Sequence, residues 1–277
     1  MKSLINSLFR IILGVIIAIP LLLYPYLYFA QDQLLFIQPK ISNQTLKRIK
    51  QENPNVEEIR IETADNVILH GWFVKNSAAQ KSPLLIYFGG NSEELSGEIR
   101  EFDQFKKWSL LLINYRGYGL SQGKPSEKHL FSDAVLIYDN FAKRADIDKE
   151  KIVAIGRSLG TGVAVHLASQ RAIKGVILIT PYDSIKNVAQ GVYPYAPVSW
   201  LLKYHFDSQA LAPSIKIPML ALIAQNDKMI PPSHAFALIK AWGGTVHKKI
   251  IPNTVHNNIS HGRGYWESVK EFLDLIN

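Results

Sequence analysis

The chain has 277 residues, of which 47% are apolar and 19% charged, and it contains no cysteine. These values allow one large domain with a short appendage, and they exclude disulfides, thiolate metal sites and a cysteine nucleophile. The net charge of +8 comes from basic residues in small groups, never in one long block. We therefore expect a solvated basic surface with some attraction to anionic lipid, and no nucleic-acid partner.

The first long feature is an uncharged stretch at residues 11–30. Its length is sufficient to cross the hydrocarbon core of a bilayer. A cleaved signal peptide needs small residues before its cleavage site, but Tyr28 stands there, so an uncleaved anchor is favoured. The basic N-terminus predicts a cytoplasmic start and a main domain on the extracytoplasmic side, although basic residues also follow the stretch. We divide the chain into an anchor (1–30), a polar connector with a short helical piece (31–55) and a folded domain (56–277).

From Val56 onward, candidate strands alternate with candidate helices, which is typical of an α/β domain with a mostly parallel sheet covered on both faces. The first two strands flank a turn at Asp65 and predict an antiparallel hairpin. The eight predicted strands are 57–63, 67–74, 84–88, 110–114, 152–155, 175–179, 219–224 and 246–251. The predicted helices are 93–107, 127–144, 159–170, 233–242 and 265–276.

The connection between the sixth and seventh strands is too long for an ordinary loop. It is rich in tyrosine, proline and tryptophan, and such aromatic content argues against a disordered insertion. We expect residues 182–213 to form a lid over a site at the edge of the sheet.

The pentapeptide at residues 156–160 has the pattern G-x-S-x-G, with Ser158 at its centre. A strand precedes it and a helix follows it, which is the context of a nucleophile elbow. Such a turn strains the backbone of the serine, and side chains at Gly156 or Gly160 would clash with their neighbours. In return the hydroxyl is exposed beside the free N–H groups of a helix N-terminus. The alternative is a glycine-rich turn that contains a serine by chance.

A serine nucleophile needs a base within hydrogen-bond reach, and the base needs an acid that orients it. Both partners are expected just past the carboxyl ends of later strands. Asp227 follows strand 219–224 and His256 follows strand 246–251, which gives the expected chain order of serine, acid and histidine. Asp183 is an alternative acid and His261 an alternative base.

The remaining histidines are weaker candidates. His234 is one of several without an acidic neighbour in register, and no histidine pair has the spacing of a metal site. We therefore expect no metal.

An oxyanion hole needs two N–H groups. The first is expected from the backbone of Leu159, the residue after the nucleophile. The second is expected from the turn at residues 88–91, after the third strand, where glycines such as Gly90 let the backbone approach a substrate closely.

Together these segments resemble the α/β-hydrolase family, and within it the BEM46/ABHD13-like membrane-anchored branch, which is also similar to the ABHD17-type depalmitoylases. The matching segments are 87–91, 114–121, 156–160, 181–184 and 206–208, with Asp227, Pro231, His256 and Asn257. The resemblance implies an α/β-hydrolase fold with an eight-stranded sheet. It also implies Ser158, Asp227 and His256 as the triad, with Leu159 and Asn91 as the oxyanion donors.

The chain departs from the family pattern at two positions. Gly89 stands where the turn after the third strand usually has histidine, and Val255 stands where glycine commonly precedes the catalytic histidine. Neither change removes a reacting group. We interpret the loop at residues 114–121 as structural and expect Arg116 to hold neighbouring backbone.

These features predict a membrane-anchored serine hydrolase that cleaves a carboxylic ester or thioester through an acyl-enzyme, without a cofactor. Tyr193, Trp200 and Phe206 of the lid are expected to bind an apolar, lipid-like acyl part together with Gly90. One alternative is a serine peptidase of aminopeptidase type that uses the same triad. Another is a non-catalytic, membrane-tethered binding module of the same fold. No protein partner is inferred.

Overall fold

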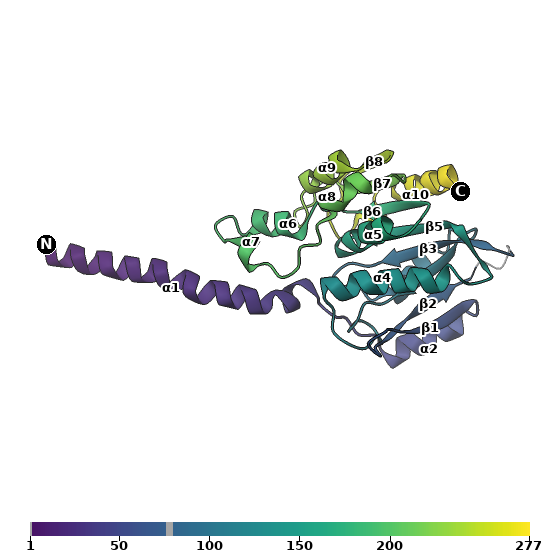
Figure 1. Cartoon of the computed structure of the whole chain (residues 1–277), viewed down its shortest axis with the longest axis horizontal. Helices are drawn as coiled ribbons and strands as arrows, with labels where there is room; N and C mark the ends of the chain where they lie inside the picture. Colours follow the sequence, from purple (N-terminus) through teal and green to yellow (C-terminus); the bar gives the residue numbers. More distant parts are fainter. Residues whose placement is uncertain (1, 76–79) are drawn as a thin grey trace.

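The computed structural model describes residues 2–75 and 80–277 (Figure 1). Within them, eight strands form one sheet in the order β1-β2-β4-β3-β5-β6-β7-β8. β1 and β2 form the expected antiparallel hairpin, β2 is also antiparallel to β4, and all other neighbours are parallel. The mostly parallel eight-stranded sheet is therefore confirmed. The strands are β1 (Val56–Glu62), β2 (Ile68–Val74), β3 (Ser82–Phe88), β4 (Ser109–Ile113), β5 (Ile147–Arg157), β6 (Gly175–Ile179), β7 (Met219–Ala224) and β8 (Val246–Ile251).

The central strands are continuous apolar runs because helices cover both faces of the sheet. Along β3, Ile86 points into one core cluster and its neighbour Leu85 into the other, as the two-residue period of a strand requires. The first cluster lies under α4 (Glu127–Phe141) and α5 (Leu159–Gln170). The second lies under α10 (Tyr265–Ile276).

The helix predicted at residues 93–107 is wrong in extent. Only the short η1 (Leu95–Gly97) and α3 (Glu98–Glu101) are helical there. Beyond them Phe105 N–H donates to the Phe102 carbonyl at 3.0 Å, and Trp108 N–H donates to Phe105 at 2.8 Å. All three aromatic side chains are buried. Their three-residue spacing suits successive tight turns rather than the 3.6-residue period of an α-helix. Packing of the rings on the sheet therefore outweighs the local preference for a helix.

The N-terminal helix α1 (Lys2–Leu35) projects away from the sheet (Figure 1). Its segment Leu4–Leu35 is long and apolar enough to cross a membrane, and the most apolar part of it is not buried by the rest of the chain. α1 extends past both ends of the predicted stretch. The short helix expected in the connector is α2 (Asn43–Glu52).

The long connection after β6 is folded. It contains α6 (Ile185–Val192), α7 (Val198–Leu201), α8 (Ser208–Leu211) and η2 (Ala212–Ser214), and α9 (Pro232–Ala241) follows β7. In Figure 1, α6 and α7 lie on the side of the domain from which α1 emerges. We use "lid" for residues 182–213.

Two side chains near the end of α1 hold the segment around α7. The Gln31 amide nitrogen donates to the Leu201 carbonyl, and its amide oxygen accepts from the Lys203 N–H, both at 2.8 Å. Asp32 accepts a hydrogen bond from the Tyr204 hydroxyl at 2.8 Å. These contacts fasten the last turns of the apolar helix to the folded domain.

Arg116 holds carboxylates, which corrects the expectation that it holds backbone. Its Nε and Nη2 atoms each donate to Asp133 on α4 at 2.8 Å, and Nη1 donates to Asp65 in the β1–β2 turn at 2.6 Å. The guanidinium is almost fully buried, as is the Asp133 carboxylate. By bonding both carboxylates, Arg116 ties the β1–β2 hairpin to α4. A buried charge left without its partner is strongly unfavourable.

We therefore predict that Arg116→Ala lowers the free energy of unfolding by about 3–5 kcal/mol, because it leaves Asp133 buried and unpaired. The measurement is urea unfolding of the detergent-solubilised chain. The control is Arg171→Ala, which removes a similar pair with Asp139 at the surface and is expected to change stability by about 1 kcal/mol or less. Equal effects of the two substitutions would contradict the prediction.

Candidate active site

Ser158 stands at the junction between β5 and α5 in a strained conformation, with φ 51° and ψ −117°. Its N–H donates to the carbonyl of Ile179 at the end of β6, at 2.9 Å. A Cβ atom at Gly156 would collide with the backbone of Gly160, and one at Gly160 would collide with the carbonyl of Phe88. The turn therefore requires glycine at both positions, and it leaves the serine hydroxyl at the carboxyl edge of the sheet.

The side chains of Ser158, His256 and Asp227 meet at this edge. His256 Nε2 lies 2.9 Å from Ser158 Oγ, and His256 Nδ1 lies 2.7 Å from Asp227 Oδ2. A carboxylate only accepts hydrogen bonds, so Nδ1 carries the hydrogen and Nε2 is free to accept the serine proton. Asp227 Oδ1 accepts the N–H groups of Met229 and Ile230, both at 2.9 Å, which fixes the carboxylate. The three side chains are therefore hydrogen-bonded in the order serine, histidine, aspartate.

The alternative acid, Asp183, is occupied by other partners. Its Oδ1 lies 2.8 Å from His234 Nδ1 and accepts the Ser184 N–H, while Oδ2 accepts from Asn187 at 2.6 Å. The expectation that His234 has no acidic neighbour is therefore wrong. The two residues are distant in sequence, and only the folding of the lid beside α9 brings them together. The alternative base, His261, has no hydrogen bond to Ser158 or Asp227 in the part of the chain that the structure describes.

The turn at residues 88–91 lies beside the serine, since a Cβ atom at Gly90 would be 3.8 Å from the Cβ of Ser158. Among the described residues, neither the Leu159 N–H nor the Asn91 N–H has an acceptor in the protein. The Asn91 carbonyl accepts from the Ile37 N–H at 3.0 Å and from the Tyr118 hydroxyl at 2.7 Å, which holds the turn in place.

Glu93 supports this turn, although sequence reasoning did not identify it. Its Oε2 accepts the Gly90 N–H at 2.7 Å and its Oε1 accepts the Tyr87 hydroxyl at 3.0 Å. A Cβ atom at Gly89 would lie 3.2 Å from Glu93 Oε2 and 2.6 Å from a methyl group of Leu95. The departure from histidine to glycine at position 89 thus leaves room for a carboxylate that holds the turn.

Arg157 connects the turn to the loop that carries the histidine. Its Nη1 lies 3.8 Å from Glu93 Oε1, and its Nη2 donates to the Asn257 carbonyl at 3.2 Å. The variable position before the serine in G-x-S-x-G therefore carries a side chain that bridges two site loops. The motif gives no signal for this role, because it fixes only the glycines and the serine.

A second acidic residue lies behind Glu93. Burial raises the pKa of Glu98 to about 9, and the neighbouring charge of Glu93 adds to this effect. Glu98 is therefore neutral at pH 7. Burial also raises the pKa of the Tyr87 hydroxyl, so this group stays a hydrogen-bond donor to Glu93.

The three lid residues expected to bind substrate occupy different surroundings. Tyr193 is 43% exposed and lines a groove between the lid and α1, and Trp200 is 88% exposed beyond the groove. Phe206 is fully buried and packs against Phe131 with ring centroids 5.2 Å apart. Phe206 therefore belongs to the core and not to the groove.

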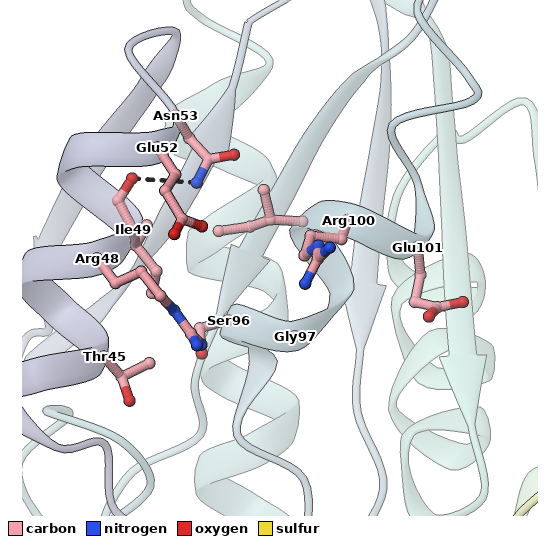
Figure 2. Close-up of a pocket in the computed structure, with 10 residues that line it drawn as sticks. Thr45, Arg48, Ile49, Glu52, Asn53, Ser96, Gly97, Arg100 and Glu101 are labelled. Carbon is pink, nitrogen blue, oxygen red and sulfur yellow. Dashed lines mark hydrogen bonds between the residues drawn. The ribbon is translucent and has the colours of Figure 1, made fainter.

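A separate polar hollow of about 400 Å³ lies between α2 and the η1–α3 turn (Figure 2). Arg48 and Glu52 line it from α2, and Arg100 and Glu101 from α3. None of its lining residues belongs to the serine–histidine–aspartate arrangement. Within residues 2–75 and 80–277, no group of three or more histidine, cysteine or acidic side chains is arranged to hold a metal ion.

Comparison with known proteins agrees with the fold. A family described as serine hydrolase matches residues 138–275, and the family described as alpha/beta hydrolase fold matches residues 67–204. Protein bem46 of Schizosaccharomyces pombe is 30% identical over 270 residues, which cover 93% of this chain and 90% of bem46. A membrane protein of Saccharomyces cerevisiae is 31% identical over 227 residues, covering 78% of this chain and 79% of the yeast protein. The esterase Pf2001 of Pyrococcus furiosus superposes with a TM-score of 0.68 at 22% identity, over 86% of this chain and 98% of the esterase.

The sheet order, the serine at the elbow and the matched families define a hydrolase of the α/β-hydrolase fold. Within that fold, the chain belongs to the BEM46-like α/β-hydrolases. The resemblance inferred from the motifs is thereby confirmed.

We predict that Glu98→Gln removes a pH dependence of stability. The pKa of Glu98 is raised from 4.5 to about 9 in the folded chain, so the unfolded state releases this proton at lower pH than the folded state does. The stability that protonated Glu98 contributes is therefore fully present below about pH 4.5 and is lost as the pH rises toward about 9.

Each unit of pKa shift corresponds to about 1.4 kcal/mol, so a fraction of this shift is measurable by urea unfolding at several pH values. Glu98→Gln is expected to flatten the wild-type decline in stability, and Glu101→Gln, at an exposed position on α3, to leave it unchanged. A decline that persists in Glu98→Gln would contradict the assignment.

Proposed function

We propose that this protein is a membrane-anchored serine hydrolase that cleaves carboxylic ester or thioester bonds through an acyl-enzyme on Ser158. The observation that carries the proposal is the pair of short contacts that link Ser158 to His256 and His256 to Asp227, at 2.9 and 2.7 Å. The name of the Pyrococcus furiosus relative, an esterase, supports the reaction class.

In the first half-reaction, Ser158 Oγ forms a bond to the substrate carbonyl carbon while its proton passes to His256 Nε2. The carbonyl oxygen becomes an oxyanion, which the N–H groups of Leu159 and Asn91 stabilise. Asp227 keeps the imidazole in the productive tautomer and stabilises its positive charge. The bond to the leaving alcohol or thiol then breaks, and the leaving group takes the proton from His256.

In the second half-reaction, a water molecule gives its proton to His256 Nε2 and bonds to the acyl carbon. The oxyanion forms again at the same two N–H groups. Its collapse releases the carboxylic acid, and the proton on His256 returns to Ser158 Oγ. No cofactor is needed for either half, because the side chains supply every proton transfer.

The proposed role of α1 is to hold this chemistry at a bilayer. The helix has 34 residues, and at a rise of about 1.5 Å per residue it exceeds the thickness of a hydrocarbon core. The name of the yeast relative, a membrane protein, supports an anchor. With the basic N-terminus in the cytoplasm, the catalytic domain would lie on the extracytoplasmic side.

We predict that Ser158→Ala abolishes covalent labelling by a fluorophosphonate probe, because the probe bonds to the activated hydroxyl. Ester hydrolysis should fall by several orders of magnitude, leaving about 10³-fold over water from binding and the oxyanion hole. Ser92→Ala, which removes an exposed hydroxyl just after the turn at residues 88–91, serves as the matched control and should keep full labelling. Labelling that survives in Ser158→Ala would rule out this nucleophile.

The acid is tested by a second pair of substitutions. Asp227→Asn should lower kcat by about 10⁴-fold, because an amide at this position favours the wrong histidine tautomer. Asp183→Asn breaks a similar carboxylate–histidine contact with His234 and should have a much smaller effect. Stopped-flow or steady-state hydrolysis of p-nitrophenyl acetate measures both. A larger loss in Asp183→Asn would reassign the acid.

A further inference from the structure

The helix α6 in the lid has an apolar stripe that the rest of the chain covers only in part. Val188, Ala189 and Val192 lie three and four residues apart and therefore share one face with Ile185. Ile185 and Val188 pack in part against the first core cluster, but no residue of α6 is fully buried, and Val192 is 60% exposed. A surface helix normally packs such a stripe against a core, so the exposed end of this face at Val192 can accept a further apolar partner.

The last turns of α1 present a matching stripe. Leu27, Leu34 and Leu35 lie at positions i, i+7 and i+8 on one face of the helix. Residues of both stripes line a groove of about 520 Å³, together with residues of α7. Gln31 fastens α1 to the Leu201 and Lys203 backbone, which fixes the end of α1 beside the lid.

The groove reaches the loop of the proposed catalytic acid. Lys228 and Met229, which directly follow Asp227, line it, and the Met229 N–H donates to Asp227 Oδ1 at 2.9 Å. Lys228 is the only charged side chain among the lining residues. A peptide in such a groove would find few partners for its backbone amides, whereas an alkyl chain needs none.

The tip of the lid carries exposed aromatic residues next to the apolar helix. Tyr195 and Trp200 are 95% and 88% exposed, and the Tyr24 hydroxyl of α1 donates to the Tyr195 carbonyl at 3.4 Å. Tyrosine and tryptophan are enriched where proteins meet the boundary between headgroups and acyl chains. The open side of the groove therefore lies at the level of the bilayer surface when α1 spans the membrane.

We propose that the groove between α1 and α6 binds the long acyl chain of an ester substrate that enters from the bilayer. The end of α1 is then one wall of the substrate site as well as an anchor. This inference rests on the proposed hydrolase function and adds the substrate class, a membrane-resident long-chain acyl ester. A water-soluble short-chain ester would reach Ser158 without contacting the groove.

The first test compares p-nitrophenyl palmitate with p-nitrophenyl acetate, using the full chain in detergent micelles. Ala189→Trp fills the groove and Val188→Asp places a charge in it. Each should lower kcat/KM for the palmitate ester by about tenfold or more and leave that for the acetate ester unchanged. Gly191→Asp adds the same charge to α6 at a position where a Cβ atom meets no neighbour, and it should change neither value.

Fluorophosphonate labelling of Ser158 reports whether each variant is folded. If labelled variants lose activity on both esters equally, or on neither, the groove does not bind the acyl chain and the inference is overturned. Hydrolysis of the acetate ester by the wild-type chain, with no turnover of the palmitate ester, would also overturn it while leaving the proposed function intact.

A second test does not depend on turnover. The Ser158→Ala chain is placed in phosphatidylcholine vesicles that contain a phosphatidylcholine with a photoactivatable palmitoyl chain, and crosslinked peptides are mapped. Crosslinks to α6 that disappear with Ala189→Trp and persist with Gly191→Asp support the groove. Crosslinks confined to α1, as for any spanning helix, would overturn it, whether or not the protein hydrolyses an ester.

Discussion

The site depends on one strained residue. Ser158 has a positive φ because β5 must turn sharply into α5. Gly156 and Gly160 lack side chains, so the backbones of β5, α5 and β3 can approach one another closely enough for that turn. The turn aims the hydroxyl across the carboxyl edge of the sheet, toward loops that follow β7 and β8. A relaxed turn would point the hydroxyl elsewhere, and the contact with His256 would be lost even with every side chain present.

Parallel strand pairing converts this local turn into a site. β5, β6, β7 and β8 are consecutive neighbours, so the residues that follow them gather at one edge. Asp227 and His256 come from this edge, and the Ile179 carbonyl at the end of β6 fixes the serine backbone. Residues widely separated in sequence are thus positioned by the sheet, with Arg157 and Glu93 as additional links among the loops.

Buried strands and strongly periodic helices were predictable from the sequence, because their apolar patterns reflect burial within a few residues. The helix at 159–170 and the strand at 219–224, for example, have the predicted bounds. The segment at 93–107 was not predictable, because its aromatic residues fold as turns only against a sheet formed by distant strands. Similarly, the contact between Asp183 in the lid and His234 on α9 joins residues that are distant in sequence, and no local pattern encodes it. Glu93 contacts Gly90 within the same turn, but the motifs give no signal for a carboxylate that supports it.

The residues just after α1 are part of the folded domain. Phe36 is buried against Tyr204, the Ile37 N–H donates to Asn91, and the Pro39 carbonyl accepts from Gly119. A truncation that removes the span to give a water-soluble protein must therefore end before Gln31. A truncation that also removes Phe36 and Ile37 would expose the core and release the turn that carries the proposed oxyanion donor. Loss of activity in such a fragment would then reflect a damaged site rather than the loss of membrane contact.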